Sequence, residues 1–108
     1  MLRSIKCAQR MPRHIAVKLD GTGASSVLVG SKEVTLTDNG VGDYTLTFVQ
    51  PFARVPVVVA SSITAGAVIQ IASATVSACQ IVVKDTSAAA LDADLMIMIQ
   101  GFDAADEY

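Results

Sequence analysis

The chain has 108 residues, of which 52% are hydrophobic but only 5% are aromatic, and its formal net charge is −2. This length fits one domain, which can bury roughly two-thirds of its unfolded surface and needs no disulfides to fold. Two cysteines, Cys7 and Cys79, are too few for the disulfide framework of a small secreted protein. We expect Cys79, within ACQIVV, to be a buried free thiol.

The N-terminal residues 1–13 are basic, and we expect them to form an arm ahead of a single domain at 14–108. Residues 1–18 contain five bases and no acid, whereas the rest of the chain has three bases and ten acids. The segment lacks the apolar core of a signal peptide, and no run is long enough for a transmembrane helix, so we expect no membrane partner. No aromatic residues are interleaved to stack bases, so an acidic protein surface is favoured over nucleic acid. The predicted contact residues of the arm are Arg3, Lys6, Arg10 and Arg13.

Alternating apolar and polar residues predict a succession of short β-strands. The apolar residues are mostly β-branched, as in VPVVV and IVV, and these side chains suit a pleated sheet better than a helix. SAAALDAD is too short to predict a helix. Seven or eight strands spaced by about ten residues indicate an all-β fold, a small antiparallel β-sandwich, with a small β-barrel as the alternative. The candidate strands are 14–19, 27–29, 34–37, 44–49, 55–62, 67–73, 78–85 and 92–102.

The stretch DNGVGD at 38–43 lies between two of these strands and predicts a hairpin turn. Asn-Gly is a strong hairpin signal because both residues tolerate positive φ, and a second glycine allows a longer or bulged loop. The two aspartates can accept hydrogen bonds from backbone N–H groups of the loop. A calcium loop would need oxygen ligands at alternate positions, where glycines stand here. A non-standard cation site on the side-chain oxygens is the weaker alternative. The turn residues are Asp38, Asn39, Gly40, Gly42 and Asp43.

The last strand and VPVVVA are apolar on both faces. In DLMIMIQGF, Ile97 and Ile99 alternate with Met96 and Met98. A two-layer sandwich cannot cover both faces of such strands, so a loop, the N-terminal arm or another copy of the chain must do so. We favour another copy, because exposed apolar patches of this size mark interfaces. The predicted interface residues are Val57, Val58, Val59, Met96, Met98 and Phe102.

No pattern of catalytic residues is apparent. The single histidine, His14, has neither a GxSxG nor a CxxC sequence to accompany it. Asp92 and Asp94 could form an acid pair for a hydrolase, but carboxylates at the start of an apolar strand more commonly face solvent. We predict no catalytic residues, no metal and no cofactor.

The stretch KLDGTGASSVLVGSKEVTLTDNGVGDYTLTFVQPF at 18–52 resembles a module of tail-fibre and other virion proteins of tailed bacteriophages. The matching residues are Gly21-Thr22-Gly23, Asp38-Asn39-Gly40, Gly42-Asp43-Tyr44-Thr45 and Phe48. Looser similarity extends to about Phe102. The resemblance implies a β-sandwich-like, trimeric virion protein that is assembled in the host cytoplasm. It carries no binding residues over to this chain.

Three functions follow from these observations. The chain is short and has no shaft repeats, so the first is a small homotrimeric capsid decoration (cement) protein that contacts the major capsid protein or other virion proteins. The second is a tail-fibre or appendage module that binds a host-surface glycan or another tail or collar protein. The third, a hydrolase that uses Asp92 and Asp94, has the least support.

Overall fold

Alternation of more and less exposed side chains marks most of the strands and separates their two faces. The computed structural model describes residues 12–22 and 25–102. Strand β8, for example, alternates buried Leu95, Ile97 and Ile99 with exposed Met96 and Met98, because successive side chains of a strand point to opposite faces. Eight strands form: β1 (Pro12–Asp20), β2 (Ser26–Val29), β3 (Val34–Gly40), β4 (Asp43–Phe48), β5 (Val57–Ser62), β6 (Val68–Ala74), β7 (Ala78–Lys84) and β8 (Leu95–Phe102).

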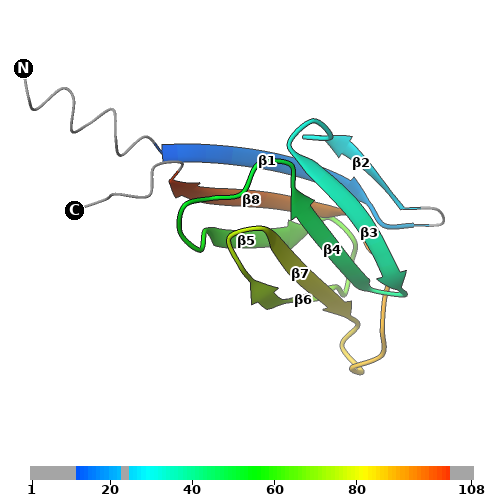
Figure 1. Cartoon of the computed structure of the whole chain (residues 1–108). Coiled ribbons are helices and arrows are strands. Elements are labelled where there is room, and N and C mark those ends of the chain that lie inside the picture. The colour runs from blue at the N-terminus through cyan, green and yellow to red at the C-terminus, as the bar shows by residue number, and fades with distance from the viewer. Residues whose placement is uncertain (1–11, 23–24, 103–108) are drawn as a thin grey trace, which may run out of the picture.

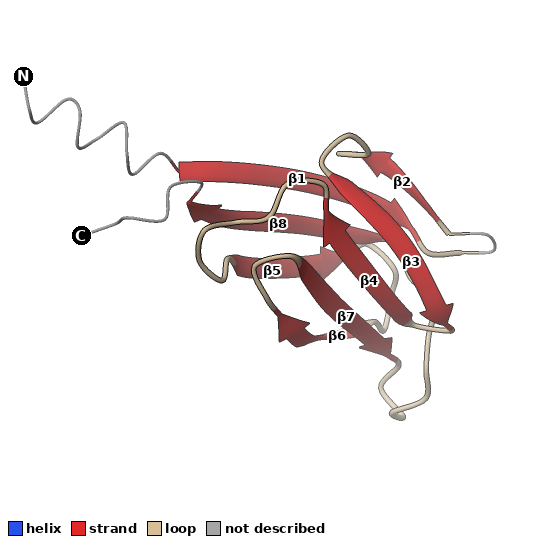
Figure 2. Ribbon diagram, in the orientation of Figure 1, coloured by secondary structure: helices blue, strands red, loops and turns tan. Residues whose placement is uncertain are grey.

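The strands make two four-stranded antiparallel sheets packed face to face (Figure 1). Sheet A has the order β2-β1-β8-β5 and sheet B the order β3-β4-β7-β6. In Figure 2 the strands of sheet B cross in front of those of sheet A, and the rest of the described chain is loop. The predicted all-β sandwich is therefore confirmed. The described residues contain no helix long and apolar enough to cross a membrane.

The strand predictions match the structure closely, with two informative differences. The last strand begins at Leu95 rather than Asp92, so Asp92 and Asp94 lie in the segment before it. Strand β1 begins at Pro12, so Arg13 belongs to the sandwich and not to an arm. The first residue of β1 and the last residue of β8 lie at the same end of sheet A, because Pro12 and Phe102 are register partners.

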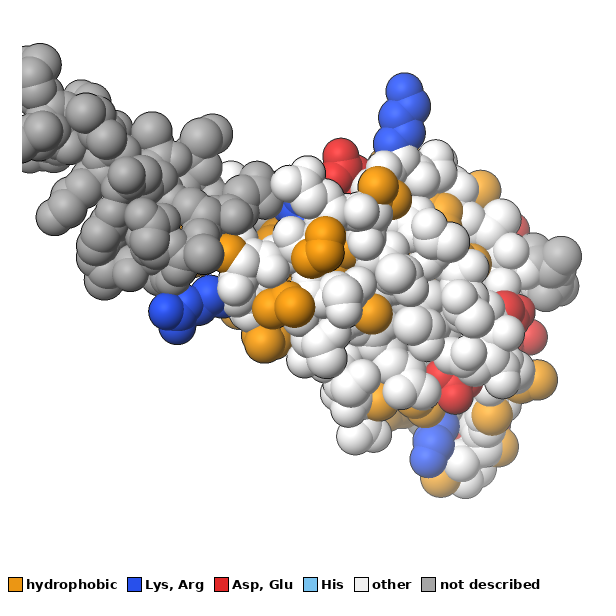
Figure 3. Space-filling model, in the orientation of Figure 1, with side chains coloured by type: hydrophobic (Ala, Val, Ile, Leu, Met, Phe, Trp, Pro, Cys, Tyr) orange, Lys and Arg blue, Asp and Glu red, His pale blue; other side chains and the backbone are white. Residues whose placement is uncertain are grey.

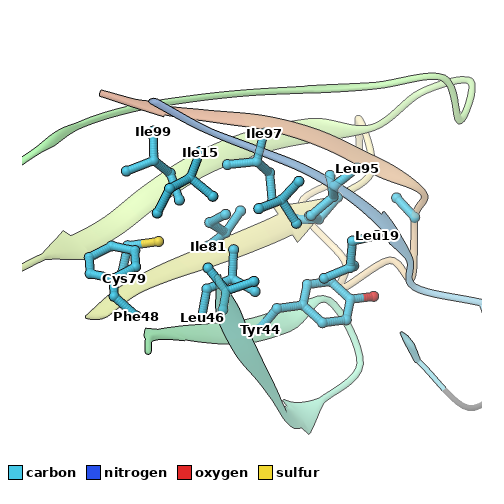
Figure 4. Close-up of a cluster of buried hydrophobic side chains, with 14 of the residues drawn as sticks. Ile15, Leu19, Tyr44, Leu46, Phe48, Cys79, Ile81, Leu95, Ile97 and Ile99 are labelled. Atoms are coloured by element: carbon cyan, nitrogen blue, oxygen red, sulfur yellow. The ribbon is translucent and has the colours of Figure 1, made fainter. Parts of the chain in front are cut away.

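The core lies between the two sheets. Figure 4 shows the isoleucines and Leu95 of sheet A above a layer of side chains from sheet B. Phe48 and Phe52 close one end of this core, with ring centroids 5.1 Å apart in an edge-to-face contact. Cys79 is buried there as a free thiol, as predicted, and burial raises its pKa to about 11. Cys7 lies outside the described residues. The buried set is Ile15, Val17, Leu19, Val34, Tyr44, Leu46, Phe48, Phe52, Cys79, Ile81, Val83, Ala93, Leu95, Ile97 and Ile99.

Candidate functional site: the outer face of sheet A

The outer face of sheet A is apolar at its centre and polar toward the two ends of its strands. The central row runs across the sheet from Ala16 through Met98 to Val59, which are register partners. One row toward the end of β1, Lys18 lies between Val29 and Met96, and Ser61 follows Met96. On the other side of the central row lie His14, Gln100 and Val57. An apolar centre with a polar rim is the usual anatomy of a protein–protein interface.

Large apolar side chains on this face are unusually exposed. Val57, Val59 and Met98 are 66%, 62% and 61% exposed, although they lie within the strands β5 and β8 and not in loops. A shallow depression of about 320 Å³ spans the same face and reaches from Val29 on β2 to Val59 and Ser61 on β5. The depression lies over the centre of the sheet and is lined mainly by apolar groups.

The outer face of sheet B is different. Thr35 and Thr37 of β3 lie opposite Thr47 and Thr45 of β4, and these four side chains form a polar array. Figure 3 views the molecule from this side, where most of the surface is white and hydrophobic side chains are scattered. These two strands therefore have one buried face and one wet, threonine-rich face, and the contrast between the two outer faces singles out sheet A.

Five of the six predicted interface residues lie on the outer face of sheet A or at its end. Val57, Val59, Met96 and Met98 are exposed there, and Phe102 is 43% exposed at the end of β8. The sixth residue, Val58, does not lie on this face, because its side chain is partly buried against the core. The sequence pattern missed this because VVV is apolar at every position, which hides the alternation.

Six further residues lie on this face and were not among the predicted interface residues: His14, Ala16, Lys18, Val29, Ser61 and Gln100. The alternation in HIAVKL already puts Ala16 and Lys18 opposite the core residues Ile15, Val17 and Leu19. Their closeness to Met96 and Met98 depends on β1 pairing with β8, about 80 residues along the chain by register. Local sequence carries no signal for that pairing.

Of the four predicted contact residues of the basic arm, one lies within the described residues. Arg3, Lys6 and Arg10 lie outside the described residues. Arg13 is inside them, and its guanidinium carbon stacks 3.9 Å from the centroid of the Phe52 ring while its Nη2 donates to the Gln50 carbonyl at 2.6 Å. Arg13 therefore covers the end of the core and belongs to β1 rather than to an arm, while its contact with the capsid or another partner stays a prediction.

The DNGVGD stretch is a hairpin, with a bulge between Asp38 and Gly40. Gly40 and Gly42 have φ of 131° and 67°, so the turn uses two glycines in conformations that other residues rarely adopt. Asn39 does not have positive φ, contrary to the expectation for an Asn-Gly turn. Asp38 accepts the Gly40 N–H at 2.9 Å, as predicted, and this bond lowers the pKa of Asp38.

The prediction that Asp43 accepts a backbone N–H of the turn is wrong, because its carboxylate accepts from side chains instead. Its Oδ1 accepts hydrogen bonds from the side-chain amides of Gln80 at 2.9 Å and Asn39 at 3.3 Å. The Gly42 N–H instead donates to Oδ1 of Asp92 at 2.9 Å. The turn is thus held by a carboxylate fifty positions away in the sequence, which local reading could not reveal.

Asp92 also anchors the one tyrosine of the core. The Tyr44 hydroxyl lies 3.0 Å from Oδ1 of Asp92 and 3.1 Å from the Gly21 carbonyl, and it shares its single hydrogen between them. A Cβ on Gly21 would collide with the Tyr44 hydroxyl, which explains a glycine at that position. The Asp92 carboxylate is therefore occupied by structural hydrogen bonds. Asp94 meets different partners, since its N–H donates to Thr64 and its carbonyl accepts from Ser62.

Within residues 12–22 and 25–102, no three potential metal ligands gather in one place. Asp38, Asn39 and Asp43 of the weaker cation alternative are instead engaged by Ser25, Thr45 and Gln80 respectively, at 2.7–2.9 Å. These bonds give each polar group of the turn a structural role in bracing the hairpin.

No family model matches the chain, and neither a curated protein nor a solved structure matches it.

Proposed function

We propose that this chain is a non-enzymatic structural protein of a tailed-phage virion, most specifically a small homotrimeric decoration protein that stabilises the capsid shell. The observation that carries the proposal is the apolar outer face of sheet A, which contrasts with the polar outer face of sheet B. The similarity of residues 18–52 to a phage virion module supplies the setting.

The mechanism is adhesion. Copies join through the outer face of sheet A, and the assembly bridges neighbouring capsid subunits. A stable protein contact buries on the order of 1,600 Å² in total. Repeating a moderate contact over many copies on one shell multiplies its effect without catalysis.

The basic segment before β1 contributes to attachment through its positive charge. Arg3, Lys6 and Arg10 precede Pro12, and no acid lies among residues 1–11. Such a segment is attracted to an acidic surface on the capsid or on a neighbouring copy. A chain that starts at Met11 keeps Arg13 on Phe52 and should therefore fold normally while attaching to shells more weakly.

Light scattering on the purified chain, followed by co-sedimentation with undecorated phage heads, tests the proposal. We expect a trimer that sediments with heads, and weaker sedimentation of the Met11 chain at equal unfolding stability. A trimer that ignores heads would overturn the decoration role and favour the appendage module, which a glycan array and binding to purified tail proteins would then test. Equal attachment of the Met11 chain would remove the role of the arm.

A further inference from the structure

We propose that three copies pack the outer faces of sheet A around a threefold axis, with Met98 of each copy at the centre. This inference rests on the self-association proposed above and specifies its geometry. The occupant of each apolar face is thus two further copies of the same chain, which meet it along the axis.

The width of sheet A suits this arrangement. Four strands at about 4.8 Å spacing make a face about 19 Å wide, and a triangle with sides of that length has its centre about 5.5 Å from each side. Packed sheets lie about 10 Å apart, so each contributes about 5 Å of side chain. Three four-stranded faces therefore close into a triangular prism that side chains fill without a central channel.

The lengths of the side chains follow the same geometry. The two central strands, β1 and β8, carry the long outward side chains Lys18, Met96, Met98 and Gln100. The edge strands, β2 and β5, carry the short ones: Val29, Val57, Val59 and Ser61. In a prism the space is deepest in front of the central strands and narrows at the corners, where edge strands of two copies meet. Two flat sheets packed as a pair would have uniform spacing and no need for this gradient.

Ala16 is a short side chain in the middle of the central strand β1, and it supports the arrangement. It lies beside Met98 in the central row and lines the depression of about 320 Å³. The depression leaves room for a methionine of a neighbouring copy. Methionine is flexible and polarisable, so it can fill such an irregular space.

The area available also points to more than one partner. The face measures roughly 19 Å by 26 Å, or on the order of 500 Å², and a pair of such faces buries only about 1,000 Å² in total, near the lower limit for a specific interface. Around a threefold axis each copy meets two neighbours, and the edges of β2 and β5 add contact at each corner. In a closed cyclic assembly of this kind, every copy has its apolar face covered by its neighbours.

The corners provide a specific test. Val29 and Ser61 lie at opposite edges of one row, through Lys18 and Met96. Threefold rotation keeps that row at one height, so Val29 of one copy meets Ser61 of the next. In a Cys7→Ser background, the pair Val29→Cys and Ser61→Cys should give covalent trimers on non-reducing gels after oxidation or treatment with a short bis-maleimide. Each single variant should stay monomeric on the gel, because its cysteines lie at different corners.

Covalent dimers alone would indicate a twofold pair of faces and overturn the inference. No covalent species under either treatment would overturn it too. As a second measurement, Met98→Asp should convert the trimer to a monomer in light scattering, with Thr47→Asp on the outer face of sheet B as the matched control. Phage heads take no part in these experiments. Covalent trimers that fail to bind heads would therefore refute the decoration role while leaving the threefold arrangement in place.

Discussion

At the scale of single residues, the Tyr44 hydroxyl connects three parts of the chain. It reaches Asp92 and the Gly21 carbonyl from a fully buried ring. Tyr44→Phe should lower the free energy of unfolding by about 1–2 kcal/mol, because two acceptors lose a partner in a partly buried place. Urea denaturation measures this loss. Asp92→Asn is the control, since it retains an acceptor oxygen, and a Tyr44→Phe chain as stable as the parent would contradict the role of the hydroxyl.

The ionisation of the same residue gives a pH prediction. Burial, and then the hydrogen bond to the Asp92 carboxylate, raises the pKa of Tyr44 from 10.0 to about 12. The folded state holds the phenol proton more tightly than the unfolded state does. Tyr44 therefore contributes stability that is complete below pH 10 and is lost as the pH rises toward 12. Absorbance titration of a Tyr108→Phe chain checks this, and ionisation near the ordinary tyrosine pKa in the folded chain would refute it.

At the scale of an element, the hairpin at DNGVGD depends on Gly42 for two reasons. Its φ is positive, and a Cβ there would collide with the Val83 carbonyl and meet the Leu91 carbonyl at 2.8 Å. Gly42→Ala should therefore cost at least about 2 kcal/mol of unfolding free energy, since strain and backbone collision add. Gly66→Ala is the matched control. Gly66 also has positive φ but open space around it, so only the conformational cost of about 1 kcal/mol should appear. Equal losses in the two variants would show that the collision at Gly42 is relieved.

At the scale of the whole molecule, the threefold arrangement makes the charge of Lys18 unfavourable for trimer assembly. Lys18 lies on the central strand β1 next to Met96, so three ammonium groups would converge near one end of the axis. Like charges repel, and each loses water on assembly. Lys18→Met keeps the length of the side chain and removes the charge, so it should tighten the trimer about tenfold or more, measured by mass against dilution. Lys84→Met, on an exposed position of sheet B, should leave assembly unchanged. A weaker Lys18→Met trimer would mean that Lys18 faces an acidic group instead.

The sequence by itself determined the fold class, the approximate strands and which side chains of most strands face the core. Alternation with period two follows from the stereochemistry of each strand, so it can be read locally in DYTLTF and in LMIMIQGF. The hairpin was equally local, because glycines at 40 and 42 permit the turn. Apolar runs such as VVV were the exception, and there Val58 was assigned to the wrong face.

Only the tertiary structure decided which strands are neighbours, and the candidate site depends on that. Ala16 and Lys18 join Met96 and Met98 in one face because β1 pairs with β8, and Asp92 holds Gly42 because the chain returns to the turn after β7. Arg13 is likewise part of the sandwich and not of the arm, because its guanidinium packs on the ring of Phe52, which is distant in the sequence. Such contacts join residues tens of positions apart, and their energy is set by how all strands pack together rather than by the local pattern around any one of them.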